Sequence, residues 1–132
     1  MKNIIIFILV MTAASEPSFA QLVWFGKKMT VEKAEKRWGG EGFDASRFKN
    51  GGLTERSKMA SSLLRNKNRW IGRPIEDIRK ELGNHDGYYF TDTIPAYLIT
   101  WAEKSNDEIW QIVFLPDGNY LVKDVIIEQN GS

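Results

Sequence analysis

Apolar positions between residues 54 and 82 recur every three to four residues, which is the period of an α-helix. The first run predicts a helix from a capping Thr54 to about Asn66. The second predicts a helix that begins near Pro74, a residue suited to a first helical turn, and closes at Gly83. The two apolar faces consist of Met59, Ala60, Leu63, Leu64, Ile75, Ile78 and Leu82, with Trp70 and Ile71 between the helices.

Beyond residue 96 the apolar period drops to two, as in β-strands. Three runs predict strands at 97–102, 109–115 and 120–128, separated by turn residues at 104–107 and 116–119. Because each element must bury its apolar side, the chain predicts an α+β fold in which two helices pack on a three-stranded antiparallel β-meander as a two-layer sandwich. The middle strand is apolar on both faces, so the N-terminal arm or a partner should cover the second face.

Residues 21–53 predict an N-terminal arm in front of this domain. Its apolar spacing indicates one short helix between Thr30, a good N-cap, and Gly39, a good stop. A glycine-rich stretch follows, with one further turn of helix from Asp44. Phe43 and Phe48 are expected to attach the arm to the domain.

The first 20 residues have the features of a secretory signal peptide. Lys2 precedes an apolar run from Ile4 to Val10, and Ser18 and Ala20 put small residues where a signal peptidase cuts, which predicts cleavage after Ala20. The alternative is an uncleaved anchor, but a spanning helix needs about 20 apolar residues. The expected division is therefore a signal peptide at 1–20, the arm at 21–53 and one soluble domain at 54–132, with no later transmembrane segment.

The 132-residue sequence contains no cysteine. This excludes a disulfide framework, a thiolate nucleophile, a zinc–thiolate site and a lipid-bearing cysteine after the signal. An exported protein without disulfides fits a bacterial periplasm better than the small disulfide-rich domains that eukaryotes secrete. We therefore expect a periplasmic location.

Charge is segregated along the chain although the net charge is only +1. Residues 56–83 contain eight basic and three acidic residues, and the balance reverses from residue 84 onward. Arg65, Lys67 and Arg69 are candidates for binding anionic lipid headgroups, since each such charge near a membrane contributes about 1 kcal/mol. A solvated helix face is the favoured interpretation of the same pattern, because helices routinely carry basic solvent faces, and nucleic acid is not an expected partner of an exported protein.

The order Arg56-x-x-Met59-x-x-x-Leu63, then Ile71-Gly72, then a short helix ending at Gly83, then Asp86 and a meander resembles a known family. It is similar to the SmpA/OmlA (BamE-like) small outer-membrane lipoproteins of the barrel-assembly machinery, whose fold is also that of a β-lactamase-inhibitory-protein repeat. The resemblance covers about residues 54–128 and implies an envelope protein partner. Gln21 stands where that family has its lipidated cysteine, so the chain would be a non-lipidated relative.

No constellation of residues predicts an enzyme. His85 is the single histidine and lies beside Asp86 in a glycine-flanked turn, without a nucleophile or second histidine for acid–base chemistry. The turn at 116–119 lacks the ligand pattern of a calcium loop, and the glycine pairs do not form a phosphate loop. We expect no catalytic residue, no metal and no cofactor.

Tyr88, Tyr89 and Phe90 are three consecutive aromatic residues, and alternation prevents all three from pointing inward. At least one should be exposed, and exposed aromatics are enriched where proteins bind each other. The sequence thus favours a non-enzymatic, protein-binding module of the cell envelope. The alternatives are a periplasmic inhibitor or immunity protein that blocks an enzyme or toxin, and an enzyme whose carboxylates cannot be paired from the sequence.

Overall fold

The computed structural model describes residues 27–104 and 107–130; the predicted signal peptide and its cleavage site lie outside these ranges. Within them, every helix is too short or too polar to cross a bilayer. The elements in chain order are β2 (Lys28–Met29), α2 (Val31–Trp38), α3 (Ala45–Asn50), α4 (Leu53–Arg65), the 3₁₀ turn η2 (Lys67–Arg69), α5 (Ile75–Leu82), β3 (Ala96–Leu98), β4 (Trp110–Pro116) and β5 (Val122–Gln129).

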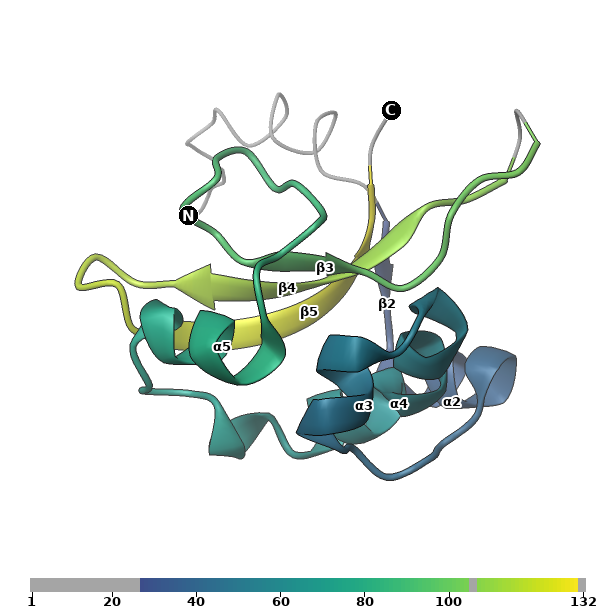
Figure 1. The fold of residues 1–132 in the computed structure, drawn as a ribbon, viewed down its shortest axis with the longest axis horizontal. Coiled ribbons are helices and arrows are strands. Elements are labelled where there is room, and N and C mark those ends of the chain that lie inside the picture. Colours follow the sequence, from purple (N-terminus) through teal and green to yellow (C-terminus); the bar gives the residue numbers. More distant parts are fainter. Residues whose placement is uncertain (1–26, 105–106, 131–132) are drawn as a thin grey trace, which may run out of the picture.

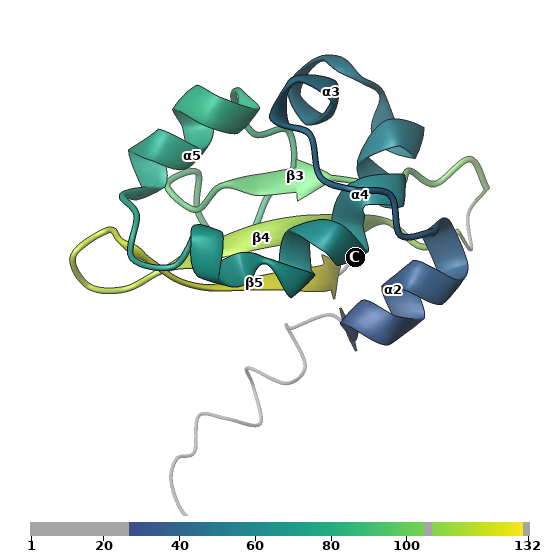
Figure 2. The ribbon, with the colours of Figure 1, turned by 90° about the horizontal axis from the view of Figure 1, so that it is seen from below.

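The predicted α+β fold is confirmed: an antiparallel sheet of order β2-β5-β4-β3 carries the helices on one face (Figure 1). Figure 2 looks onto this helical layer, with α2 beside α4 at one end and α5 at the other. The sheet has four strands rather than the predicted three, because Lys28 and Met29 pair with Glu128 and Ile127. Two residues are too few to show a period in the sequence, so this edge strand was not predicted.

Two predicted strands prove shorter, and side chains explain both differences. β3 ends at Leu98 because Thr100 leaves the regular ladder: its hydroxyl accepts from Trp110 N at 2.8 Å and donates to Glu108 O at 3.1 Å. β5 begins at Val122, not at residue 120, because Tyr120 has a φ of 62° and still belongs to the turn.

The predicted helix caps are partly confirmed. Thr30 and Asp44 are N-caps whose side chains accept from backbone N–H groups three residues later, at 3.2 and 2.9 Å. Thr54, however, is not a cap: α4 begins one residue earlier, with Gly52 as its N-cap and the Gly52 carbonyl accepting from Arg56 N. Pro74, which was expected in the first helical turn, is instead the N-cap of α5 and directly precedes that turn.

The main core lies between the helices and the sheet and is built on aromatic rings in edge-to-face contact. Phe48, Tyr97, Phe114 and Trp70 form a continuous chain in which neighbouring ring centroids are 5.6 to 5.9 Å apart, a favourable geometry for aromatic pairs. All four are fully buried. Phe48 comes from the N-terminal arm, as does the buried Ala34, so the arm contributes to the same core as the rest of the chain.

The second face of the sheet carries a smaller apolar cluster. Ala96, Val113 and Ile126 form its centre, and Tyr89 and Ile94 pack against it. Both of these come from the segment 84–95 between α5 and β3, which passes over the face opposite the helices (Figure 1). This segment therefore covers part of the face that the sequence assigned to the arm or to a partner.

The outer edge of β5 is closed at both of its ends. At one end, β2 pairs with Ile127 and Glu128. At the other, Gly72 N donates to Val122 O at 2.7 Å and Val122 N to Arg73 O at 2.8 Å. Between them, the Asp124 carboxylate accepts from Val125 N at 2.8 Å.

Candidate interaction surface

The segment 84–95, here called the aromatic loop, is fastened to the sheet by backbone and side-chain bonds. Gly87 N donates to Ala96 O at 2.7 Å, and there is no room for a Cβ at this glycine because the Gln111 amide oxygen would lie 2.3 Å away. The Asp86 carboxylate accepts from Leu98 N at 3.0 Å. The start of the loop thus runs along the outer edge of β3.

Gln111 of β4 is the central anchor of this loop. Its side chain is almost completely buried, which is uncommon for a glutamine. Its amide oxygen accepts from Tyr88 N at 3.1 Å and its amide nitrogen donates to Tyr88 O at 2.8 Å and to a Glu128 carboxylate oxygen at 3.2 Å. The Gln111 amide therefore bonds both the N–H and the carbonyl of Tyr88, as a neighbouring strand would do.

Arg79 of α5 holds the other end of the loop. Its guanidinium donates to the carbonyl oxygens of Asp92 and Thr93 at 3.0 and 2.9 Å, and it is fixed from its own helix by Glu76 at 2.7 Å. An arginine can serve all three acceptors because it carries five N–H donors. Contacts from a helix and two strands thus hold the loop at both ends and in the middle.

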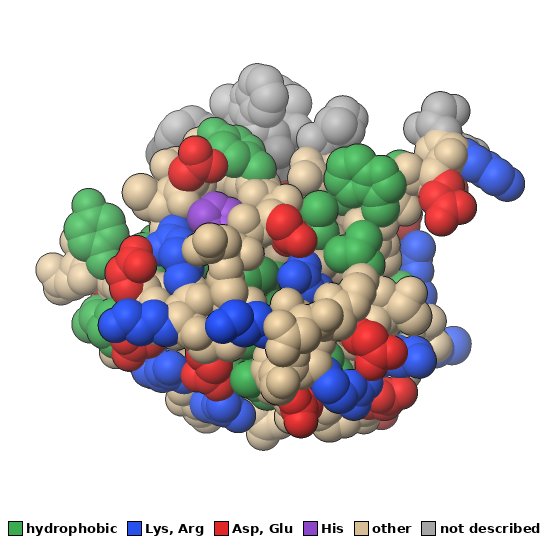
Figure 3. Space-filling view, in the orientation of Figure 1, with side chains coloured by type: hydrophobic (Ala, Val, Ile, Leu, Met, Phe, Trp, Pro, Cys, Tyr) green, Lys and Arg blue, Asp and Glu red, His purple; other side chains and the backbone are tan. Residues whose placement is uncertain are grey.

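The three consecutive aromatics divide as alternation predicted. Tyr89 turns onto the apolar cluster of the second face, and burial raises the pKa of its hydroxyl. Tyr88 and Phe90 are 54% and 53% exposed. Figure 3 shows hydrophobic side chains at the surface on this side of the molecule, whereas charges of both signs alternate on the helical side.

Phe90 is held in an uncommon conformation. Its φ is 64°, in the left-handed region that bulky residues rarely occupy. The Phe90 carbonyl accepts from the Tyr88 hydroxyl at 2.6 Å, and its ring meets Tyr89 edge to face at 4.7 Å. Strain of this kind persists only where the surroundings fix it and is concentrated at functional sites.

His85 lies at the start of the loop with its ring 6.4 Å from that of Tyr97. Its Nδ1 is buried and has no hydrogen-bond partner among the residues that the structure describes. Burial, followed by the nearby charge of Arg79, lowers the pKa of His85. Its surroundings therefore favour the neutral imidazole, and the buried Nδ1 does not face an open cleft.

The structure gives each of the three predicted lipid-binding cations an acidic partner. Arg65 pairs with Glu35 of α2, and Lys67 pairs with Asp124 of β5 at 3.0 Å. Arg69 pairs with Glu81 of α5. These partners are distant in the sequence, so the basic stretch looks like free charge only when the chain is considered linearly.

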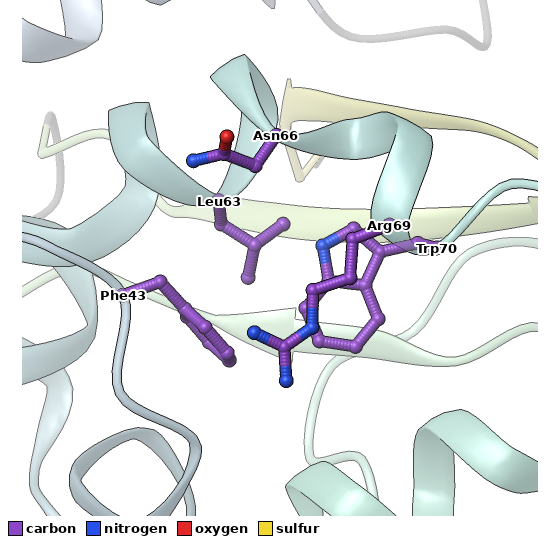
Figure 4. A pocket seen from close by; sticks show the side chains of 5 residues that line it. All are labelled: Phe43, Leu63, Asn66, Arg69 and Trp70. Atoms are coloured by element: carbon purple, nitrogen blue, oxygen red, sulfur yellow. The ribbon is translucent and has the colours of Figure 1, made fainter.

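Arg69 is also one of the five residues that line a hollow of about 270 Å³ (Figure 4). Its guanidinium carbon lies 5.2 Å from the Phe43 ring and 4.9 Å from the Trp70 ring, distances at which a cation is attracted to an aromatic face. Figure 4 shows the guanidinium between these two rings. The cation is therefore held by Glu81 of α5 and by two aromatics, although about half of its side chain stays exposed.

Two residues that position the loop were not predicted as site residues. Arg56, 8% exposed, donates to Phe48 O, Leu98 O and the Asp86 carboxylate at 3.1, 3.2 and 2.9 Å. The sequence did indicate a special role for Arg56, because this arginine shares the apolar helix face of Met59 and Leu63. Gln111 gave a similar signal as the single polar residue inside an apolar strand.

Among residues 27–104 and 107–130, no three histidine or acidic side chains gather as a metal site would require. Comparison with protein-family models gives no match, and neither characterised proteins nor solved structures show significant similarity. Function must therefore be argued from the geometry above.

Proposed function

We propose that this chain is an exported, non-enzymatic binding module of the bacterial cell envelope that recognises a protein partner with the aromatic loop. The export part rests on the signal-like first 20 residues, and the envelope part on the resemblance to the BamE-like family. The binding part rests on the loop.

The observation that carries the proposal is the combination of exposure and rigidity in the loop. Tyr88 and Phe90 leave about half of their surface to solvent, yet their backbone is fixed by Gln111, Asp86 and Arg79. Aromatics presented on an ordered backbone bind well, because little conformational entropy is lost when the partner arrives. The same anchors seat Tyr89 and Ile94 on the sheet, and they leave Tyr88 and Phe90 half exposed on a fixed backbone.

A cross-linking and pull-down experiment with the 21–132 chain tests this function. The bait carries Tyr88→Ser and Phe90→Ser together; its matched control is Tyr120→Ser, because Tyr120 is 64% exposed and also has a left-handed φ but lies in another turn. We expect one envelope protein to be retained by the wild type and the control and lost with the double variant. Equal retention by all three chains would remove the loop from the proposal.

Expression of the full chain tests export separately. When the full chain is expressed in a bacterium, mass spectrometry of the periplasmic fraction should find a protein that begins at Gln21. A full-length chain in the membrane fraction would contradict cleavage and favour the anchor instead.

The partner found in the pull-down also separates the two kinds of binding module. If it is an enzyme whose activity falls on binding, the inhibitor alternative gains support over a scaffold.

A further inference from the structure

Positive charge without an acidic partner is concentrated away from the stretch that looks most basic in the sequence. Between residues 56 and 80, seven of the eight basic residues form ion pairs in the structure. Lys27, Lys28 and Lys33 carry no ion pair with any described residue, and the three are close in space because β2 leads directly into α2. Three of the lysines that form no ion pair with a described residue therefore lie together at the β2–α2 corner.

A hollow of about 280 Å³ opens at this corner. Four basic residues and one acid line it: Lys27, Lys28, Lys33, Arg37 and Glu108. Lys33 and Arg37 are one helical turn apart, so both stand on the same side of α2. Met29 and Trp110 complete the lining and give the hollow an apolar part.

The one acid in the lining positions a cation. Glu108 accepts from Arg37 at 3.0 Å and from the Trp110 indole N–H at 3.0 Å, and these two donors hold the pKa of its carboxyl below the ordinary value. Arg37 in turn lies 5.2 Å from the Trp38 ring and 5.9 Å from the Trp110 ring. Arg37 is thereby paired within the lining, whereas Lys28 and Lys33 form no ion pair with a described acid and Lys27 acts on Glu108 only through its nearby charge.

We propose that the hollow formed by Lys27, Lys33, Arg37 and Trp110 is a binding site for a phosphate ester. The charge of the lining residues is +3 after Glu108 is counted, which suits a doubly charged phosphate better than a single carboxylate. Lysine ammonium and arginine guanidinium groups are the side chains that proteins use for phosphate. The hollow is larger than a phosphate group, and Met29 and Trp110 offer apolar contact to the carbon part of an ester. The site is independent of the aromatic loop.

Nuclear magnetic resonance titration of the 21–132 chain tests this site, with the indole N–H of Trp110 as a reporter. Inorganic phosphate, phenyl phosphate and chloride are added at constant ionic strength. A further titration uses phosphatidylcholine vesicles with and without phosphatidylglycerol, to separate a free ester from a lipid headgroup. The variant is Lys27→Gln/Lys33→Gln; the control is Lys80→Gln/Lys123→Gln, which removes two exposed lysines that form no ion pair with the described residues and do not line the hollow.

We expect the wild type to bind phenyl phosphate more tightly than inorganic phosphate. The affinity of the Lys27/Lys33 variant for phenyl phosphate should be at least tenfold lower than that of the wild type, and the affinity of the control should be within twofold of it. Binding only to vesicles that contain phosphatidylglycerol, lost in the same variant, would support the site with a lipid headgroup as the source. Equal weakening by variant and control would show an unspecific charge effect and overturn the proposal, as would a Trp110 signal that phosphate moves no more than chloride does.

Discussion

Phe90 and Tyr120 are the two residues other than glycine with a positive φ in the described part of the chain. The left-handed conformation costs a side-chain-bearing residue roughly 1–2 kcal/mol. At Phe90 the ring contacts Tyr89, whereas Tyr120 presents 64% of its surface to solvent in the turn before β5. At Tyr120 the backbone makes the described contact instead of the ring, since its carbonyl accepts from Ile75 N, at the start of α5, at 3.0 Å.

Tyr120→Gly should stabilise the fold relative to Tyr120→Ala by about 1 kcal/mol, because glycine adopts a positive φ without steric cost. Both variants remove the ring, so the comparison isolates the backbone. Urea unfolding measures the difference. A more stable alanine variant would show that the turn does not hold a left-handed residue.

His85 should make the protein less stable as the pH falls. Its pKa in the folded state is lowered by burial, so below about pH 6.5 the unfolded chain takes up a proton more readily than the folded one. This contribution to stability is complete above about pH 6.5 and is lost as the pH falls toward the lowered pKa of the folded state.

Urea unfolding of the wild type and of His85→Gln at about pH 7.5 and 5.5 tests this effect. We expect the wild type to lose more stability than the variant, which cannot titrate. The carboxylates whose pKa is lowered, Glu55 and Glu108, titrate below this window. An equal loss in both chains would show that His85 is solvated in the folded state.

At the level of elements, features set by neighbouring residues could be predicted from the sequence, whereas features set by distant residues could not. Thr30 and Asp44 start helices as expected because a cap acts only on the next turn. The strands at 97–102 and 120–128 were predicted too long, since Thr100 and Tyr120 break the ladder through side-chain bonds and a left-handed φ that periodicity does not detect. That at least one of Tyr88, Tyr89 and Phe90 is exposed followed from alternation alone. The partner of Lys67 could not be predicted, because Asp124 is 57 residues away.

Arg56 joins three elements, since its donors reach the end of α3, the aromatic loop and β3. Arg56→Met keeps much of the apolar volume but leaves two buried carbonyl groups and Asp86 without their donor. Loss of the donor of a buried hydrogen bond costs about 1–3 kcal/mol, and the half-exposed Asp86 adds little to this. We expect that loss in urea unfolding, together with faster amide exchange at Leu98.

Arg47→Met is the matched control for this experiment. Arg47 pairs with Glu41 and Glu55 at 2.8 and 2.5 Å, but all three side chains are well exposed. Such surface pairs contribute little, so the control should lose much less stability than Arg56→Met. Similar losses in the two variants would contradict the anchoring role of Arg56.

For the whole molecule, the N-terminal arm is expected to be indispensable. Ala34 and Phe48 are fully buried in the main core, and β2 adds a strand to the sheet. A fragment of residues 54–132 would lose these contacts and expose Met59, Tyr97 and Trp110. We expect it to show no cooperative thermal transition by circular dichroism, whereas residues 27–132 should unfold in one step. A cooperative fragment would make residues 54–132 a separate folding unit.

The closed outer edge of β5 has a consequence for crowded conditions. An uncovered edge strand is a template on which a second copy can add its own strand, and the chance of this rises with protein concentration. Here β2 and residues 72–73 occupy the ends of the strand, and Asp124 engages the Val125 amide while paired with Lys67. The fold thereby discourages edge-to-edge aggregation with one two-residue strand, one loop and one carboxylate.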